Sequence, residues 1–222
     1  MNRTSTLWFF LGAFSLLSGL FLWGYVFDTR THFMAGAPPP RLPEVLPPPR
    51  LPLLRSTAPA KGGTATDTVT IVQFADFTCP ACRASEPEII KLFQNTGPRI
   101  RLVWRDLPLG QENPMTMVAT LAGRCAKDQG KFWEMHDALL QANALNIVAV
   151  KKIARLIGLN ESVFNTCLTS IKSFQQLQED LKIADANNIV RTPTFFIGRE
   201  VLGGYVTAKQ LKASVERAVF KK

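Results

Sequence analysis

The feature that most constrains this chain is a long apolar run near its start. Residues Leu7–Phe27 form 21 consecutive positions without a charge. About 20 apolar residues are enough for a helix to cross the hydrocarbon core of a bilayer. A cleavable signal peptide has a shorter apolar part of about 7–15 residues, and the best small-residue cleavage site, Ala35-Gly36-Ala37, lies far downstream. The run therefore predicts an uncleaved transmembrane anchor over residues 1–28.

A proline-rich linker is predicted over residues 29–67. The hexapeptide PPPRLP occurs at Pro38–Pro43 and again at Pro47–Pro52, and nine of the 15 prolines lie between Pro38 and Pro59. Such a segment lacks amide donors and favours polyproline II, which is typical of a semi-rigid spacer. A docking site for an SH3-like domain is the alternative. The stretch Lys61–Thr68 is then expected to be a short flexible joint.

Charge and composition exclude several classes of function. The net charge of +9 divides into +3 over residues 1–60 (five basic, two acidic) and +6 over residues 61–222 (21 basic, 15 acidic). This distribution leaves no dense basic cluster, which argues against nucleic-acid binding. Only two histidines are present, so a histidine-rich metal site is not expected. The 46% hydrophobic content is sufficient for an ordinary core.

One folded domain is predicted over residues 68–222, with a mixed α/β pattern. Apolar and β-branched runs predict strands, and helical periodicity predicts helices. The expected order is strand, helix, strand, a long helical block over about 113–188, two strands and a last helix capped by Thr207. The expected strands are Val69–Phe74, Ile100–Arg105, Thr194–Ile197 and Glu200–Leu202, and the first helix is expected from Pro80 to Asn95. This order predicts a small mixed sheet with helices on both faces and a helical insertion.

The candidate chemical motif is Cys79-Pro80-Ala81-Cys82, which follows a predicted strand and opens a predicted helix. A thiolate is the nucleophile of disulfide exchange, and a helix N-terminus favours negative charge. In this interpretation Cys79 attacks a substrate and Cys82 resolves the mixed disulfide. The alternatives are half of a zinc site, which Cys125 and Cys167 would have to complete, or two unrelated buried cysteines.

Four stretches together resemble the DsbA-like branch of the thioredoxin superfamily. They are VTIVQFADFTCPAC (69–82), VWRDLPL (103–109), QGKFWEMHDALL (129–140) and RTPTFFIG (191–198). The resemblance implies a thioredoxin fold with an inserted helical domain and thiol–disulfide oxidoreductase activity outside the cytoplasm. It also implies a cis peptide bond between Thr192 and Pro193, which would flank the cysteines and pair with an extended substrate segment. It places the C-terminal domain on the outer side of the cytoplasmic membrane, facing the periplasm or the cell exterior.

The sequence departs from strongly oxidising relatives at two positions. Ala81 stands where those proteins carry a histidine that stabilises the thiolate, and Asn113-Pro114 stands where relatives often have His-Pro. Because thiolate stabilisation makes the disulfide a stronger oxidant, these departures leave the direction of the redox reaction open.

Four further sites need interpretation. Asp76 lies three residues before Cys79 and is a candidate proton acceptor for Cys82, or a cap or loop acid. Cys125 and Cys167 are expected to form a structural disulfide, although two buried free thiols remain the alternative. His136 is expected to be a packed histidine with one hydrogen bond rather than a catalytic base. The alternating arginines Arg99, Arg101 and Arg105 are expected to form a solvated strand face, with a basic substrate groove as the alternative.

The leading functional hypothesis is a membrane-tethered oxidoreductase that forms disulfides in exported proteins and needs no bound cofactor. A quinone-linked membrane oxidase resembling DsbB or a vitamin K epoxide reductase homologue would reoxidise it. The alternatives are a reductase or isomerase with the same site, and a non-catalytic thioredoxin-fold module that binds peptides.

Overall fold

The computed structural model describes residues 58–63, 68–96, 99–110 and 113–220. The predicted anchor over 1–28 and most of the predicted linker over 29–67 lie outside these ranges. Among the described residues, no helix has the length and apolar character needed to cross a membrane.

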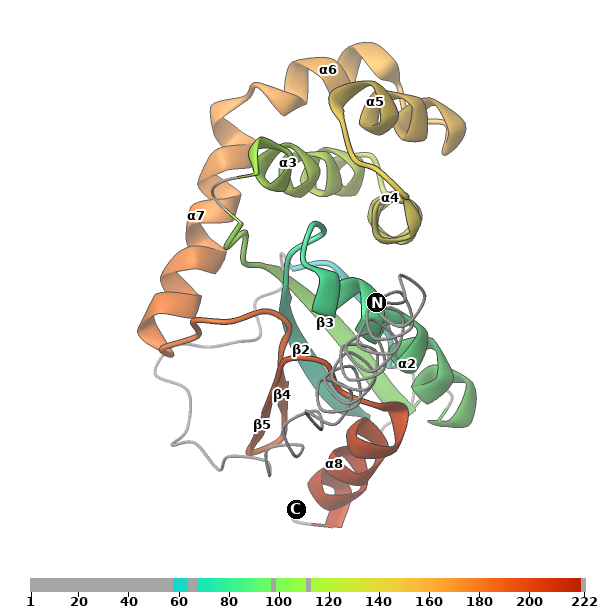
Figure 1. The fold of residues 1–222 in the computed structure, drawn as a ribbon, viewed down its shortest axis with the longest axis vertical. Helices are drawn as coiled ribbons and strands as arrows, with labels where there is room; N and C mark the ends of the chain where they lie inside the picture. The colour runs from blue at the N-terminus through green and yellow to red at the C-terminus, as the bar shows by residue number, and fades with distance from the viewer. Residues whose placement is uncertain (1–57, 64–67, 97–98, 111–112, 221–222) are drawn as a thin grey trace, which may run out of the picture. The chain divides into compact units, whose positions relative to one another are not determined.

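Five strands form one mixed sheet in the order β1-β3-β2-β4-β5 (Figure 1). The central pair β2 and β3 is parallel, and the other three pairs are antiparallel. The bounds are β1 Ala60–Gly62, β2 Val69–Ala75, β3 Ile100–Asp106, β4 Thr194–Ile197 and β5 Glu200–Gly203. β2 and β3 are buried at nearly every position because helices cover both of their faces.

Two helices cover one face of the sheet and a third covers the other. On the first face, α2 (Pro80–Thr96) and α8 (Ala208–Phe220) pack together, and apolar residues from both share one buried cluster with β2, β3 and β4. On the opposite face, α7 (Ile171–Ala186) contributes Ile183 and Ala184 to a separate cluster with β2 and β3. The helix α2 continues through Pro87, where a kink is expected from sequence.

The predicted helical insertion over about 113–188 contains α7 and four further helices. These four are α3 (Pro114–Asp128), α4 (Phe132–Gln141), α5 (Ile147–Leu156) and α6 (Glu161–Leu168). Residues 113–188 are described throughout and contain no strand, as the sequence predicts. Asparagine and serine side chains cap four helices by accepting hydrogen bonds from first-turn amides: Asn113 caps α3, Asn146 caps α5, Asn160 caps α6 and Ser170 caps α7. Thr207 opens α8 in the same way, through a reciprocal pair of hydrogen bonds with Gln210.

The edge strand β1 is not predicted from the sequence, which assigns its residues to the linker and the flexible joint. It pairs antiparallel with β3 and is fixed by two further hydrogen bonds. The amide of Trp104 donates to the carbonyl of Pro59, and the indole N–H of Trp133 donates to the carbonyl of Ala60. Three residues carry too little periodicity to reveal a strand, and here the partner residues on β3 are distant in sequence, from Gly62 with Arg101 to Ala60 with Val103.

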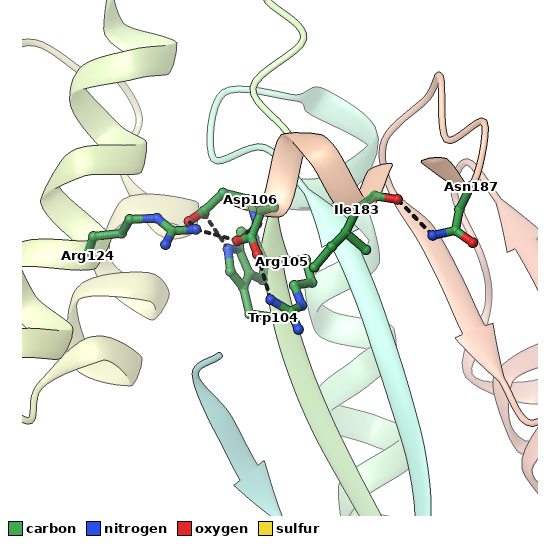
Figure 2. A network of polar contacts seen from close by, with 7 residues as sticks. Trp104, Arg105, Asp106, Arg124, Ile183 and Asn187 are labelled. Atoms are coloured by element: carbon green, nitrogen blue, oxygen red, sulfur yellow. Dashed lines mark hydrogen bonds and ion pairs between the residues drawn. The ribbon is translucent and has the colours of Figure 1, made fainter. Parts of the chain in front are cut away.

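A buried charge network corrects the expectation that Arg105 lies on a solvated strand face. Arg99 and Arg101 are exposed, but Arg105 is 2% exposed. Its Nη1 lies 2.7 Å from Oδ1 of Asp180 in α7. On the insertion side, Arg124 of α3 pairs with Asp180 and lies 2.6 Å from Oδ2 of Asp106 (Figure 2). The arginines do alternate along this segment, but α7 covers the end that carries Arg105, so only Arg99 and Arg101 are exposed.

Candidate functional site

The two motif cysteines lie at the start of α2, in different environments. Cys79 immediately precedes the helix and is partly exposed, whereas Cys82 lies one turn in and is fully buried. Both are free thiols in this structure. The turn before them is closed by a hydrogen bond from the amide of Cys79 to the carbonyl of Asp76. The sequence-predicted pair is thus brought together at the end of β2, with only its first member accessible.

The acid–base properties of the two thiols diverge. The hydrogen bond from Cys82 lowers the pKa of Cys79 to about 5, against the opposing effect of burial. The same hydrogen bond, together with burial, strongly raises the pKa of Cys82. At neutral pH this arrangement holds Cys79 as a thiolate and Cys82 as a thiol that donates to it. An accessible thiolate beside a buried thiol is the arrangement that disulfide exchange requires.

The cis-proline loop lies beside Cys79. The peptide bond between Thr192 and Pro193 is cis, as the resemblance implies. The carbonyl oxygen of Thr192 lies 3.5 Å from Sγ of Cys79, although 113 positions separate the two residues. β4 begins immediately afterwards and pairs with β2, which carries the cysteine motif at its end. The sheet therefore places this loop against the reactive sulfur.

Asp76 is buried and organises the turn that carries the cysteines. Its Oδ1 accepts hydrogen bonds from the amide and hydroxyl of Thr78, at 2.7 and 2.8 Å, and its Oδ2 accepts from the amide of Gly110. The hydroxyls of Thr78 and Thr116 lie 2.7 Å apart, which ties the turn to α3. The donors lie outside α2, so these contacts are those of a buried loop acid that fixes the turn and does not cap the helix. Its role as proton acceptor for Cys82 stays a prediction.

The other two cysteines form a disulfide within the insertion. Cys125 of α3 and Cys167 of α6 are joined, with their Cα atoms 5.7 Å apart. The pair belongs to the apolar cluster that the insertion helices share, and Cys125 is buried. Because these cysteines bond to each other, they do not complete a zinc site with Cys79 and Cys82.

A second polar cluster lies further along α2 and was not singled out from the sequence as a group. Glu86 of α2 is buried, and its Oε2 lies 3.9 Å from Nε2 of His136 in α4. His136 is fully buried, with one hydrogen bond from its Nδ1 to Asp137 at 2.7 Å, so the expectation of a packed histidine is confirmed. Lys61 of β1 lies 3.8 Å from Oε1 of Glu86. The signal available in sequence was a glutamate four positions after Cys82, which falls on the same helix face.

This cluster does not have the geometry of a cation centre. Glu86, His136 and Asp137 offer ligand atoms within 4.8 Å of one another. However, Nδ1 of His136 already lies 2.7 Å from Oδ1 of Asp137, in a hydrogen bond that an ion bound at that nitrogen would have to replace. The Lys61 ammonium already supplies positive charge beside Glu86. Glu86 and His136 are buried and Asp137 is half exposed, so these side chains are better described as a partly buried polar cluster.

Comparisons with solved structures agree with this geometry. A thioredoxin-like oxidoreductase from Silicibacter pomeroyi DSS-3 superposes with a TM-score of 0.70 at 27% identity, and covers 77% of this chain and 96% of that one. The thiol-disulfide exchange protein α-DsbA2 from Wolbachia pipientis gives a TM-score of 0.64 over 73% of this chain and 87% of its own. At 22% identity, the second likeness shows the fold alone.

Among curated proteins, similar sequence occurs within longer chains. The Na(+)/H(+) antiporter NhaA 1 of Salinispora arenicola is 38% identical over 152 residues, which are 68% of this chain and 23% of that one. This chain thus spans about a quarter of the length of that relative. The thioredoxin family model matches residues 57–217, well over half of the chain. With the sheet order and the cysteine site described above, this match shows that the protein belongs to the thioredoxin family.

Proposed function

We propose that this protein is a thiol–disulfide oxidoreductase that forms disulfides in exported proteins, with Cys79 as the nucleophile and Cys82 as the resolving thiol. The observation that carries the proposal is the lowered pKa of Cys79, about 5, beside a buried thiol at a helix start. A solved neighbour at 27% identity is a thioredoxin-like oxidoreductase, which supports the same kind of chemistry.

In the oxidising direction, a substrate thiolate attacks Sγ of Cys79 in the Cys79–Cys82 disulfide. That disulfide breaks, a mixed disulfide forms on Cys79, and Cys82 leaves as a thiolate that takes up the proton released when the substrate thiol ionised. A second substrate thiolate then attacks the substrate sulfur of the mixed disulfide and expels Cys79 as a thiolate. A thiol of low pKa leaves readily, and a stabilised reduced form makes the disulfide a stronger oxidant. The lowered pKa of Cys79 therefore favours the oxidase over the reductase or isomerase, despite the alanine at position 81.

Substrate binding is proposed at the cis-proline loop. An extended segment of the substrate would run beside Thr192 and Pro193, with its cysteine at Cys79. Support comes from the 3.5 Å approach of the Thr192 carbonyl to the Cys79 sulfur. The carbonyl of Pro193 already accepts a hydrogen bond from the amide of Gly204, so the backbone groups of Thr192 are the nearer candidates for pairing with a substrate.

Location and redox partner are further parts of the proposal. The apolar run at 7–27 would anchor the chain in the cytoplasmic membrane, with the domain facing the periplasm or cell exterior. A quinone-linked membrane oxidase would then reoxidise Cys79 and Cys82. Segments similar to this domain occur within chains named as sodium/proton antiporters, which supports a location at a membrane. Protease digestion of intact spheroplasts tests the orientation: the domain should be degraded without lysis, and protection would contradict it.

The decisive test is the reduction potential of the Cys79–Cys82 pair, measured by equilibration of the protein with glutathione. A value near about −120 mV marks a strong oxidant, and one near about −270 mV marks a thioredoxin-like reductant. A dithiol that cannot be cycled at all would exclude both enzymatic functions and favour the peptide-binding module. A Cys79→Ser variant, which cannot form the disulfide, serves as the control.

A further inference from the structure

The arginine before the cis-proline has a guanidinium without a partner among the described residues. Arg191 is exposed and lies two positions before Pro193. Its backbone carbonyl accepts a hydrogen bond from the hydroxyl of Thr194 at 2.8 Å, which closes the turn around the cis peptide bond. In the described part of the chain, neither a carboxylate nor another acceptor bonds to its side chain. The backbone of this residue is therefore fixed, while its charge is left for another molecule.

The side chain of Arg191 lies over the end of β5. Gly203 is the last residue of this strand, and a Cβ atom there would lie 3.0 Å from Cδ and 3.8 Å from Nε of Arg191. A glycine inside a strand often marks a place where another group approaches closely. Gly203 also pairs with Thr194 in the sheet, so the surface under the arginine is part of the rigid ladder. The stem of the side chain is thus supported before any substrate binds, which lowers the entropy cost of binding.

Arg191 adjoins the backbone group that approaches the reactive sulfur. The carbonyl oxygen of Thr192, the next residue, lies 3.5 Å from Sγ of Cys79. One residue along an extended segment advances about 3.3 Å. A substrate segment that pairs with Thr192 and has its cysteine at Cys79 therefore brings the residues one or two positions from that cysteine beside Arg191.

The charge of Arg191 is not used by the groups around it. Among the described groups that shift the pKa of Cys79, the hydrogen bond from Cys82 acts most strongly, and Arg191 is not one of them. Glu200, the acidic residue of β5, is already bound by Arg217. A guanidinium carries five N–H donors in a planar fork that matches a carboxylate. The anion that fits this position is therefore a carboxylate that arrives with the substrate.

We propose that Arg191 selects substrates that carry an aspartate or glutamate side chain within two positions of the reacting cysteine. The proposal rests on the proposed oxidase function and deepens it by naming a class of substrate. Arg191 determines specificity and contacts no reacting sulfur. The bonds that form and break are those given above: the substrate dithiol is oxidised and the Cys79–Cys82 disulfide is reduced. The ion pair only holds the substrate cysteine toward Sγ of Cys79.

The test compares the rates at which the oxidised full-length protein oxidises three short peptides. Each peptide has two cysteines, and the three differ only beside the first cysteine, where they carry glutamate, glutamine or lysine. Acid quenching at timed intervals, alkylation and mass measurement give the second-order rate constants. The preference for the glutamate over the glutamine peptide should be about fivefold larger in the native chain than in Arg191→Gln, as expected for an exposed ion pair. At an ionic strength of about 1 M this difference should largely vanish.

Further variants separate a local ion pair from general attraction. Arg191→Glu should favour the lysine peptide, and Arg191→Lys should keep part of the native preference, because an ammonium lacks the planar fork. Arg199→Gln removes an exposed arginine from the turn between β4 and β5 and should leave the preference unchanged. The rate with dithiothreitol, a neutral dithiol, is measured for every variant and corrects for changes in the reactivity of Cys79. Comparing each peptide across variants cancels the effect of its carboxylate on its own thiol.

The outcomes distinguish this inference from the function on which it rests. If Arg191→Gln oxidises the three peptides with the native preference, the inference is wrong. If Arg199→Gln loses as much preference as Arg191→Gln, the peptides sense only the overall positive charge, which also contradicts it. If the native protein oxidises neither the peptides nor dithiothreitol, the proposed function itself fails.

Discussion

At the scale of single residues, the central feature is the contrast between two thiols three positions apart. Helix-end electrostatics alone predict a stabilised thiolate at Cys79. The structure adds a second cause, since the buried Cys82 donates a hydrogen bond that the thiolate accepts. This cause needs no histidine between the cysteines, so Ala81 does not prevent a low pKa. The sequence alone left this point open because the donor depends on the turn geometry.

The first prediction concerns the reactivity of Cys79. Its rate of alkylation by iodoacetamide should be nearly flat above pH 6 and should fall below it, with a midpoint near pH 5, because only the thiolate reacts. The rate is measured by intact mass on the reduced protein. In Cys82→Ala the midpoint should move upward, because the donor is lost. A native midpoint near the ordinary value of about 8.5 would contradict the geometry described here.

The second prediction follows from linkage. A depressed folded pKa stabilises the folded reduced form above the unfolded pKa, and this contribution is lost as the pH falls through the folded pKa. For Cys79 the unfolded pKa is 9.0 and the folded pKa is about 5. The raised pKa of Cys82 adds nothing below its unfolded value, since it is protonated in both states there. The urea midpoint of the reduced protein, compared with the oxidised protein, should therefore rise from pH 5 to pH 8. No change in this difference would contradict the pKa of Cys79.

At the scale of elements, local patterns predicted most of the fold. β2, β3 and β4 carry apolar runs, and α2 carries a helical stripe, so their bounds agree with the sequence within one or two residues. The short strand β1 was missed because its partner groups, on β3 and at Trp133, are distant in sequence. Of the candidate site, the two cysteines and the cis-proline were predicted from the sequence. The approach of Glu86 to His136 was not predicted, because only the packing of α2 against α4 brings these residues together.

The third prediction concerns the bond between α3 and α6. Replacing both Cys125 and Cys167 by alanine should lower the free energy of unfolding by about 2–4 kcal/mol, since the closed loop spans 42 positions. Urea unfolding under non-reducing conditions measures this. The rate of exchange at Cys79 with glutathione should be retained, because the bond joins insertion helices and lies outside the reactive pair. Loss of exchange in a folded variant would give the second disulfide a role in the chemistry.

At the scale of the whole domain, a charge network joins the sheet to the insertion. Asp180 of α7 binds Arg105 of β3, 75 positions away, and Arg124 of α3, 56 positions away. Asp106 completes the group, and its side chain also accepts a hydrogen bond from the Trp104 indole at 2.7 Å (Figure 2). Sequence separation explains why these pairs were not foreseen. All four charges are buried, so each depends on the others for compensation.

The last prediction tests this network. Asp180→Asn leaves Arg105 and Arg124 without a shared acceptor, and breaking a buried ion pair from one side costs about 3–5 kcal/mol. Urea unfolding should show this loss, whereas Glu161→Gln, which breaks an exposed pair with Arg155, should cost less than about 1 kcal/mol. Because Asp180 of α7 holds Arg124 of α3, and α3 packs against α5 and α6, amide exchange should rise first in α5 and α6 while β2 and β4 stay protected. Equal loss of protection in the insertion helices and in the sheet would contradict this prediction. It would mean that the network stabilises the domain as one unit and does not specifically hold the insertion to the sheet.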